Sequence, residues 1–230
     1  ERELNDWTQE KDAWSLEIAK GSPYMHPRQM LRELEKAMPK NAMVSTDIGN
    51  ICSVSNSYLR FTQPNSMFAA MSFGNCGYAL PSIIGAKIAC PDVPVVGFSG
   101  DGAFGIAVTE LTAIGRKEWP AITHIVFRNY QWGAETRNST LWYADNFVGT
   151  ELDEQVSYAG IAKACGLQGV VARTMDELTQ ALDQAIKDQK AGKTTLIEAM
   201  INQELGEPFR RDAMKKPVEL AGVDAGDMQP

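Results

Sequence analysis

Short apolar runs alternate with amphipathic stretches along the chain. The first such stretch, HPRQMLRELEKAM, has a proline near its start and apolar residues on one helical face, so it predicts a helix. After it the pattern predicts a strand in AMVSTD, a helix over 50–60, a strand in MFAAM, a helix in YALPSIIGAKIAC and a strand in VPVVGFS. The first half of the chain is therefore predicted to alternate between helices and strands.

The second half continues the alternation. It predicts a helix over 106–118, a strand in AITHIVF, a long polar and aromatic loop, a helix over 154–164, a strand in QGVVA, a helix over 175–190 and a strand in TTLIEAM. Strands that are apolar throughout and separated by helices are typical of parallel sheets covered on both faces. We therefore expect an α/β fold with a six-stranded, mainly parallel sheet, and ligands at the carboxyl ends of its strands.

Composition narrows the classes of partner. The chain of 230 residues has a net charge of -7, an isoelectric point near 5.0 and no basic stripe, so nucleic acid is not an expected partner. No apolar run approaches the roughly 18 residues of a membrane span, and we expect no membrane partner. The four cysteines form no CxxC pair and are typical of reduced thiols in a cytoplasmic protein: Cys52, Cys76, Cys90 and Cys165.

The stretch GDGAFG, residues 100–105, fits the glycine pattern of a dinucleotide site. Such a site also needs an acidic residue about 20 positions on, at the end of the next strand, to bind the ribose. That strand instead ends in Arg128 and Asn129, and Glu118 lies before it. An arginine could bind the 2′-phosphate of NADP, so an NADP-binding module stays open as an alternative.

Asp101 and Asn129 favour a metal site. Each follows a predicted parallel strand, so its side-chain oxygen reaches the same sheet edge. With the backbone carbonyl of Gln131, two phosphate oxygens and a water, they would complete the octahedral oxygen set that suits Mg²⁺. Gly102 would let the backbone approach the phosphates. The alternative, in which GDG is a tight turn and Asn129 caps a strand end, also stays open.

GDGAFGIAVTELTAIGRKEWPAITHIVFRN resembles the cofactor-binding motif of thiamine diphosphate enzymes, which begins with GDG and ends with Asn. TDIGN and SFGNCGYALPSIIGAKIACPD are similar to loops of the acetolactate synthase group. That group has a second Asn directly before the final one, whereas this chain has Arg128 there. The chain instead resembles sulfoacetaldehyde acetyltransferases in two stretches, NYQWGAETRNSTLWYADNFVGTEL and MHPRQ. The resemblance implies thiamine diphosphate and Mg²⁺ as cofactors.

Carried over by position, the resemblance makes Asp101 and Asn129 side-chain ligands of the metal and Gln131 a backbone ligand. Cys76 stands where relatives usually have a larger apolar residue beneath the aminopyrimidine, and a small buried hydrophobe is the other interpretation. The resemblance implies eight cofactor-binding positions: Gly49, Asn50, Gly74, Cys76, Gly102, Ala103, Trp132 and Gly133.

The resemblance assigns no catalytic residue to this chain. It implies an activating glutamate in a separate N-terminal domain, with the site shared between subunits of a homodimer or homotetramer. Glu110 and Glu135 fit solvated positions better than that role, and Arg137 is either a solvated arginine or a cation for a sulfonate. We therefore expect a linker or helix from a preceding domain over 1–24, the cofactor domain over 25–205 and a tail over 206–230.

For the full enzyme the resemblance implies conversion of sulfoacetaldehyde and phosphate to acetyl phosphate and sulfite. A decarboxylating carboligase like acetolactate synthase, acting on a 2-oxo acid, would share every cofactor residue and remains the main alternative. A noncatalytic thiamine diphosphate sensor is a further one. We expect the isolated chain to be inactive, because it has no room for the domain that would carry the glutamate.

Overall fold

The computed structural model describes residues 2–116 and 118–203. Within this part of the chain, six strands form one sheet in the order β2-β1-β3-β4-β6-β5, and every neighbouring pair is parallel. This confirms the predicted α/β fold. The strands are β1 (Met43–Thr46), β2 (Met67–Ala69), β3 (Val95–Gly100), β4 (Thr123–Arg128), β5 (Gln168–Ala172) and β6 (Thr195–Met200).

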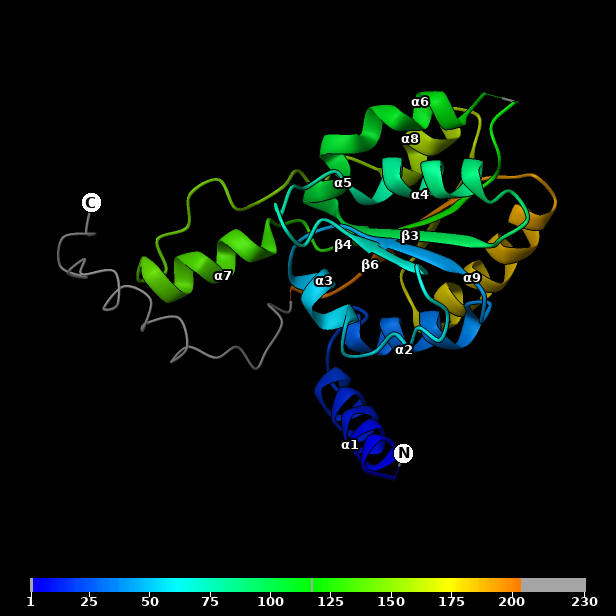
Figure 1. Ribbon diagram of the computed structural model, residues 1–230. Helices are drawn as coiled ribbons and strands as arrows, with labels where there is room; N and C mark the ends of the chain where they lie inside the picture. The colour runs from blue at the N-terminus through cyan, green and yellow to red at the C-terminus, as the bar shows by residue number, and fades with distance from the viewer. Residues whose placement is uncertain (1, 117, 204–230) are drawn as a thin grey trace.

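Helices cover both faces of the sheet (Figure 1). One face carries α2 (Pro27–Ala37), α3 (Asn50–Ser55) and α9 (Met175–Lys190). The other carries α4 (Ala79–Ala89), α5 (Asp101–Ala107), the 3-10 turn η1 (Val108–Glu110), α6 (Leu111–Ile114) and α8 (Tyr158–Ala164). Two helices lie outside these layers: α1 (Arg2–Ala19), next to α2, and α7 (Gly133–Trp142), which projects away from the sheet.

The core consists of two apolar clusters, one on each face of the sheet. Phe98 and Ile197 pack with Leu31 of α2 in the first cluster, while Val126 packs with Phe104 of α5 in the second. The central strands β3, β4 and β6 are buried along almost their whole length, which is why their sequences are largely apolar rather than alternating, whereas the edge strand β5 is partly exposed. The ends of the strands, not their faces, are left for a ligand.

Two predicted elements have the predicted bounds. Strand β5 covers QGVVA and helix α9 covers 175–190. The start of α9 is fixed by a capping box, in which the Thr174 hydroxyl accepts from the Glu177 backbone N–H at 3.2 Å and the Glu177 carboxylate accepts from the Thr174 N–H at 3.3 Å. The other predicted strands and the helices of the first half are present, several with shorter ends.

The helix predicted over 106–118 is wrong at both ends. The chain turns helical at Asp101, directly after β3, passes through η1 and ends at Ile114. The next residue, Gly115, packs against the end of α8, where a Cβ at Gly115 would be 2.3 Å from the carbonyl oxygen of Cys165. Gly100 thus ends β3, and Gly102 and Gly105 lie in the helix that follows directly.

The loop predicted after Asn129 contains a helix, α7. Its sequence, GAETRNSTLW, has no apolar stripe, and none of its residues is buried, so the hydrophobic pattern could not reveal it. The helix predicted over 154–164 begins later, at Tyr158, because the Ser157 hydroxyl caps it by accepting from the Gly160 N–H at 3.1 Å.

The domain boundaries stay predictions. Residues 1–24 include α1, which packs on α2 through Trp14, whose ring lies 4.4 Å from the guanidinium carbon of Arg28. The predicted tail over 206–230 lies outside the described residues. Among the described helices, none combines the length and the apolar character that a membrane crossing requires.

Candidate functional site

The glycine-bearing stretches TDIGN, SFGNCG and GDGAFG lie at the ends of β1, β2 and β3, so they share the carboxyl edge of the sheet, where β1 and β3 pair. From β1 the chain continues one way to β2, and from β3 it continues the other way to β4, and such a reversal is where ligands usually bind in open α/β sheets. Gly49, at the end of β1, has a φ of 131°, a backbone conformation that favours glycine. This is the edge at which the sequence placed the site.

Asp101 lies at the end of β3 and is completely buried. Its Oδ2 atom accepts from the backbone N–H groups of Tyr130 at 2.7 Å and Asn129 at 3.1 Å, and from Arg128 Nη1 at 3.2 Å. Its Oδ1 atom accepts from the Gly102 N–H at 3.0 Å. Burial raises the pKa of Asp101, while the Tyr130 N–H, the charge of Arg128 and the other donors oppose that rise.

The loops after β1 and β4 come together around Gly133. A Cβ at Gly133 would lie 3.0 Å from Asn50 Nδ2, 3.6 Å from Gln131 Nε2 and 3.9 Å from Asn129 Nδ2. Four of the predicted residues are therefore neighbours in space. Tyr130 has a φ of 60°, which turns the chain between Asn129 and Gln131.

Trp132 lies over Gly102. A Cβ at Gly102 would be 2.8 Å from the Trp132 ring, so only glycine lets the indole pack this closely against the start of α5. The assignment of Gly102 to a close approach of backbone and phosphate stays a prediction; in the structure the same glycine allows the close approach of the indole. Ala103, the next residue, is buried in the first turn of α5.

The loop between β2 and α4 carries Gly74 and Cys76. Gly74 is exposed with a φ of 77°, and its N–H donates to the Ala70 carbonyl at 2.7 Å. The Cys76 thiol is half-buried, and its pKa is raised by burial and by the carboxylates of Asp47 and Glu135. A raised pKa disfavours the reactive thiolate, so this environment suits contact with an apolar group better than nucleophilic chemistry.

Asp47 holds that loop in place, and the sequence reading assigned it no role. Its Oδ1 atom accepts from the N–H groups of Ile48 and Gly77, and its Oδ2 atom from that of Ala79, each at 3.0 Å. Ala79 is the first residue of α4, so the carboxylate caps this helix while fixing the loop before it. The position of Asp47 at a strand end beside Gly49 was the available signal.

The residues present fit a divalent cation and a diphosphate. Both polar atoms of the Asn50 side chain are buried, and within the described residues neither has a hydrogen-bond partner. An unpaired buried amide is costly, so a polar ligand at this position would satisfy it. The Oδ1 atom of Asp101 accepts only the bond from Gly102 among the bonds described above, which leaves it the capacity to bind a cation.

Other candidates are placed elsewhere or differently. Glu110 is half-buried in η1, Glu135 is exposed on α7, and Arg137 is half-buried on α7.

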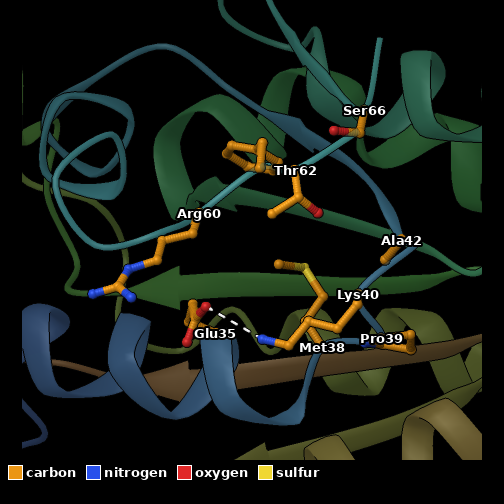
Figure 2. Close-up of a pocket in the computed structure, with 9 residues that line it drawn as sticks. Glu35, Met38, Pro39, Lys40, Ala42, Arg60, Thr62 and Ser66 are labelled. Atoms are coloured by element: carbon orange, nitrogen blue, oxygen red, sulfur yellow. Dashed lines mark ion pairs between the residues drawn. The ribbon is translucent and has the colours of Figure 1, made fainter. Parts of the chain in front are cut away.

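Figure 2 shows a hollow at the opposite edge of the sheet, between the end of α2 and the start of β1, where Lys40 lies 3.7 Å from Glu35. It contains none of the predicted site residues. Within the described ranges, no group of three or more His, Cys, Asp or Glu side chains is arranged to hold a metal.

Comparison with known proteins decides the family. Residues 47–199 match the thiamine pyrophosphate enzyme C-terminal TPP-binding domain, thiamine pyrophosphate (TPP) being thiamine diphosphate. The chain belongs to this family. The TPP-binding domain confirms the predicted recognition and supports thiamine diphosphate as the cofactor.

Two relatives of this TPP-binding domain carry the same name. It is 68% identical to the sulfoacetaldehyde acetyltransferase of Roseovarius nubinhibens, over 99% of this chain and 39% of that protein. It is 64% identical to the sulfoacetaldehyde acetyltransferase of Rhodobacter capsulatus, over 100% of this chain and 40% of that protein. The chain thus spans about two fifths of the length of these relatives.

A solved structure agrees with the fold of the TPP-binding domain. The thiamine diphosphate-dependent 4-hydroxybenzoylformate decarboxylase of Rhodococcus jostii RHA1 superposes with a TM-score of 0.73 at 23% identity, over 80% of this chain and 34% of that chain. At this level of identity the likeness concerns the fold alone.

Proposed function

We propose that this chain is the cofactor-binding domain of a sulfoacetaldehyde acetyltransferase that requires thiamine diphosphate and Mg²⁺. The enzyme would convert sulfoacetaldehyde and phosphate to acetyl phosphate and sulfite. The observation that carries the proposal is the 68% identity, over 99% of the chain, to a protein of that name. The convergence of Asn50, Asn129, Gln131 and Gly133 beside Asp101 supports the cofactor part.

Each residue at the sheet edge has a role in the proposal. Asp101 Oδ1, the Asn129 side chain and the Gln131 carbonyl bind Mg²⁺, which carries the charge of the diphosphate. The unpaired amide of Asn50 binds a diphosphate oxygen, together with the backbone near Gly49, Gly102, Ala103 and Gly133. Trp132 shields this end from water. Gly74 and Cys76 would lie beneath the aminopyrimidine.

When bound, thiamine diphosphate supplies the nucleophilic carbon and the electron sink for the reaction. The chain's own residues hold the metal, orient the diphosphate and exclude water from that end of the site. The glutamate that activates the cofactor belongs, in this proposal, to an N-terminal domain of a second subunit. The isolated 230-residue chain is accordingly inactive in the proposal.

An NADP-binding module has less support. That alternative needs Arg128 to face a 2′-phosphate, but the Arg128 side chain is 1% exposed and bonded to Asp101. Acetolactate synthase-like chemistry is the main alternative, and only the substrate distinguishes it; a noncatalytic thiamine diphosphate sensor would show no turnover at all.

The test is sulfite release from sulfoacetaldehyde by the full-length enzyme, with thiamine diphosphate, Mg²⁺ and phosphate omitted one at a time. We expect release to need all three and to fall by about 100-fold or more in Asp101→Asn, because a first ligand of the metal is lost. Asp183→Asn, the same change at an exposed position of α9, should keep full activity. Consumption of pyruvate without sulfite release would move the assignment to the carboligases.

A further inference from the structure

Arg128 is a buried cation at the end of β4, where the resemblance to acetolactate synthases predicts asparagine. Its side chain is 1% exposed, and arginine is almost never buried to this extent without partners. Nη2 donates to the carbonyl oxygens of Asp153 at 2.6 Å and Val156 at 3.1 Å, and Nη1 donates to Asp101 Oδ2 at 3.2 Å. The guanidinium carbon also lies 4.3 Å from the ring centre of Tyr130.

These contacts join two ends of one segment. Residues 129–157, called here the 129–157 segment, leave the sheet at β4, contain α7 and return at α8. Two backbone bonds close its base: Trp132 N–H to the Thr150 carbonyl at 2.7 Å and Leu152 N–H to the Tyr130 carbonyl at 2.8 Å. Arg128 adds a third tie, from the strand before the segment to its last residues. The expected metal ligands Asn129 and Gln131 lie at this base.

The Arg128 guanidinium also fixes Asp101, the third expected ligand of the metal. Asp101 Oδ2 is held between Arg128 and the backbone of Asn129 and Tyr130, so the carboxylate cannot turn without breaking bonds to both. Its Oδ1 atom then keeps one orientation, with capacity left for a cation. The hydroxyl of Tyr158 also donates to the Asp101 carbonyl at 3.0 Å, which ties α8 to the same residue.

Glu198 compensates the charge of Arg128. This carboxylate on β6 is 3% exposed, and its Oε1 atom lies 3.6 Å from Arg128 Nε. Its Oε2 atom accepts from the Ser157 hydroxyl at 3.1 Å and the Ala159 N–H at 3.0 Å. Arg128 and Glu198 together carry no net charge, so the site keeps the negative charge of Asp101 for a cation although an arginine touches it.

We propose that Arg128 is a positioning residue for the metal. It sets the place of Asp101 relative to the Asn129–Gln131 stretch, so that the three ligands face one point before the cation binds. The inference rests on the metal site of the proposed function. It also gives a reason for arginine where the acetolactate synthase group has asparagine: Arg128 fixes the 129–157 segment on the edge of the sheet.

Charge and position predict opposite results for Arg128→Met. If the arginine acted only through its charge, its removal would strengthen cation binding, because a neighbouring positive charge is lost. If it positions the ligands, its removal weakens binding. Arg128→Lys separates the two further, since lysine keeps the charge and loses the planar fork that reaches Asp101, Asp153 and Val156 together.

The experiment is a titration of the full-length enzyme with Mn²⁺ in saturating thiamine diphosphate, with free Mn²⁺ measured by electron paramagnetic resonance. Thermal unfolding of each variant shows the temperature range in which it is folded. We expect binding to weaken by about 10-fold to 100-fold in both Arg128→Met and Arg128→Lys, the range found for outer-shell partners of metal ligands. Arg116→Met is the matched control, because Arg116 is exposed and pairs with Glu118 away from the site.

Asp101→Asn in the same titration separates the two proposals. If it loses Mn²⁺ binding while both Arg128 variants bind as tightly as the wild type, or more tightly, the positioning role is overturned and the metal site stands. If Asp101→Asn binds like the wild type, the metal site itself fails and the inference fails with it. Should Arg128→Met not fold, Arg128→Lys decides, because it keeps the charge opposite Glu198.

Discussion

Replacing Asp47 by asparagine changes one oxygen of a buried carboxylate to an amide nitrogen and keeps the shape of the side chain. In the wild type the two oxygens accept from three backbone N–H groups, those of Ile48, Gly77 and Ala79, each at 3.0 Å. The side chain is 2% exposed, so water does not replace a lost bond. The substitution therefore tests how firmly the loop between β2 and α4 is held.

The magnitude follows from these bonds. Asparagine can place its oxygen at the Oδ1 position, where it keeps the bonds to Ile48 and Gly77, but its NH₂ group then faces the Ala79 N–H. A hydrogen bond to a charged group contributes about 1.5–3 kcal/mol, and an unpaired buried N–H costs about 1–3 kcal/mol. Loss of the negative charge at the start of α4 adds about 0.3–1 kcal/mol. The broken bond and the unpaired N–H are the same loss and count once, so we expect Asp47→Asn to lower the free energy of unfolding by about 2–4 kcal/mol in total.

Urea unfolding of this chain, followed by circular dichroism, measures the loss. Amide hydrogen exchange of Gly77 and Ala79 reports the same change locally, and we expect both amides to exchange faster. Because the loop carries Gly74 and Cys76, thiamine diphosphate should also bind the full-length Asp47→Asn enzyme more weakly. Asp183→Asn, at an exposed site on α9, is the control. A loss equal to that of the control, with unchanged exchange at Ala79, would refute the reasoning.

Two further predictions concern the site and the core. Gly102→Ala would place a Cβ 2.8 Å from the Trp132 ring, so the indole must shift. We expect a cofactor titration to show weaker thiamine diphosphate binding, partly restored by adding Trp132→Leu. Binding equal to that of the wild type would contradict this. Burial lowers the pKa of His124 from 6.5 to about 3, so between these pH values the unfolded chain binds a proton that the folded chain does not. Stability should fall as the pH drops below 6.5, by up to about 1.4 kcal/mol per pH unit from this group. His124→Asn should show a shallower slope in urea unfolding at pH 7, 6 and 5, and equal slopes would count against the argument.

The sequence predicted the sheet well because its central strands β3, β4 and β6 are buried on both faces. Continuous apolar runs between amphipathic stretches are a strong signal, and the helix predicted over 175–190 has the bounds of α9. Parallel strands also explain why Asp101 and Asn129 could be placed together without a structure. The hydrogen bond from the Asn129 backbone N–H to the Asp101 carboxylate, at 3.1 Å, agrees with that expectation. Their role as metal ligands stays a prediction.

What the sequence could not supply is contact between side chains and distant backbone. Nothing in the pattern shows that Arg128 reaches the carbonyls of Asp153 and Val156, because that depends on the path of the 129–157 segment. Helix α7 was missed for a related reason: it buries no residue, and a pattern of buried positions cannot reveal it. The role of Asp47 likewise depends on a loop that begins after another strand.

The strand order has a consequence for how the chain is made. Strand β6 lies between β4 and β5, although it is the last of the three to leave the ribosome. Until Thr195–Met200 has been synthesised, β4 and β5 have no partner between them, and each offers an unpaired edge to other chains. A nascent chain that stalls before residue 195 would therefore be prone to aggregation. Once β6 has emerged, it pairs with both strands and completes the sheet.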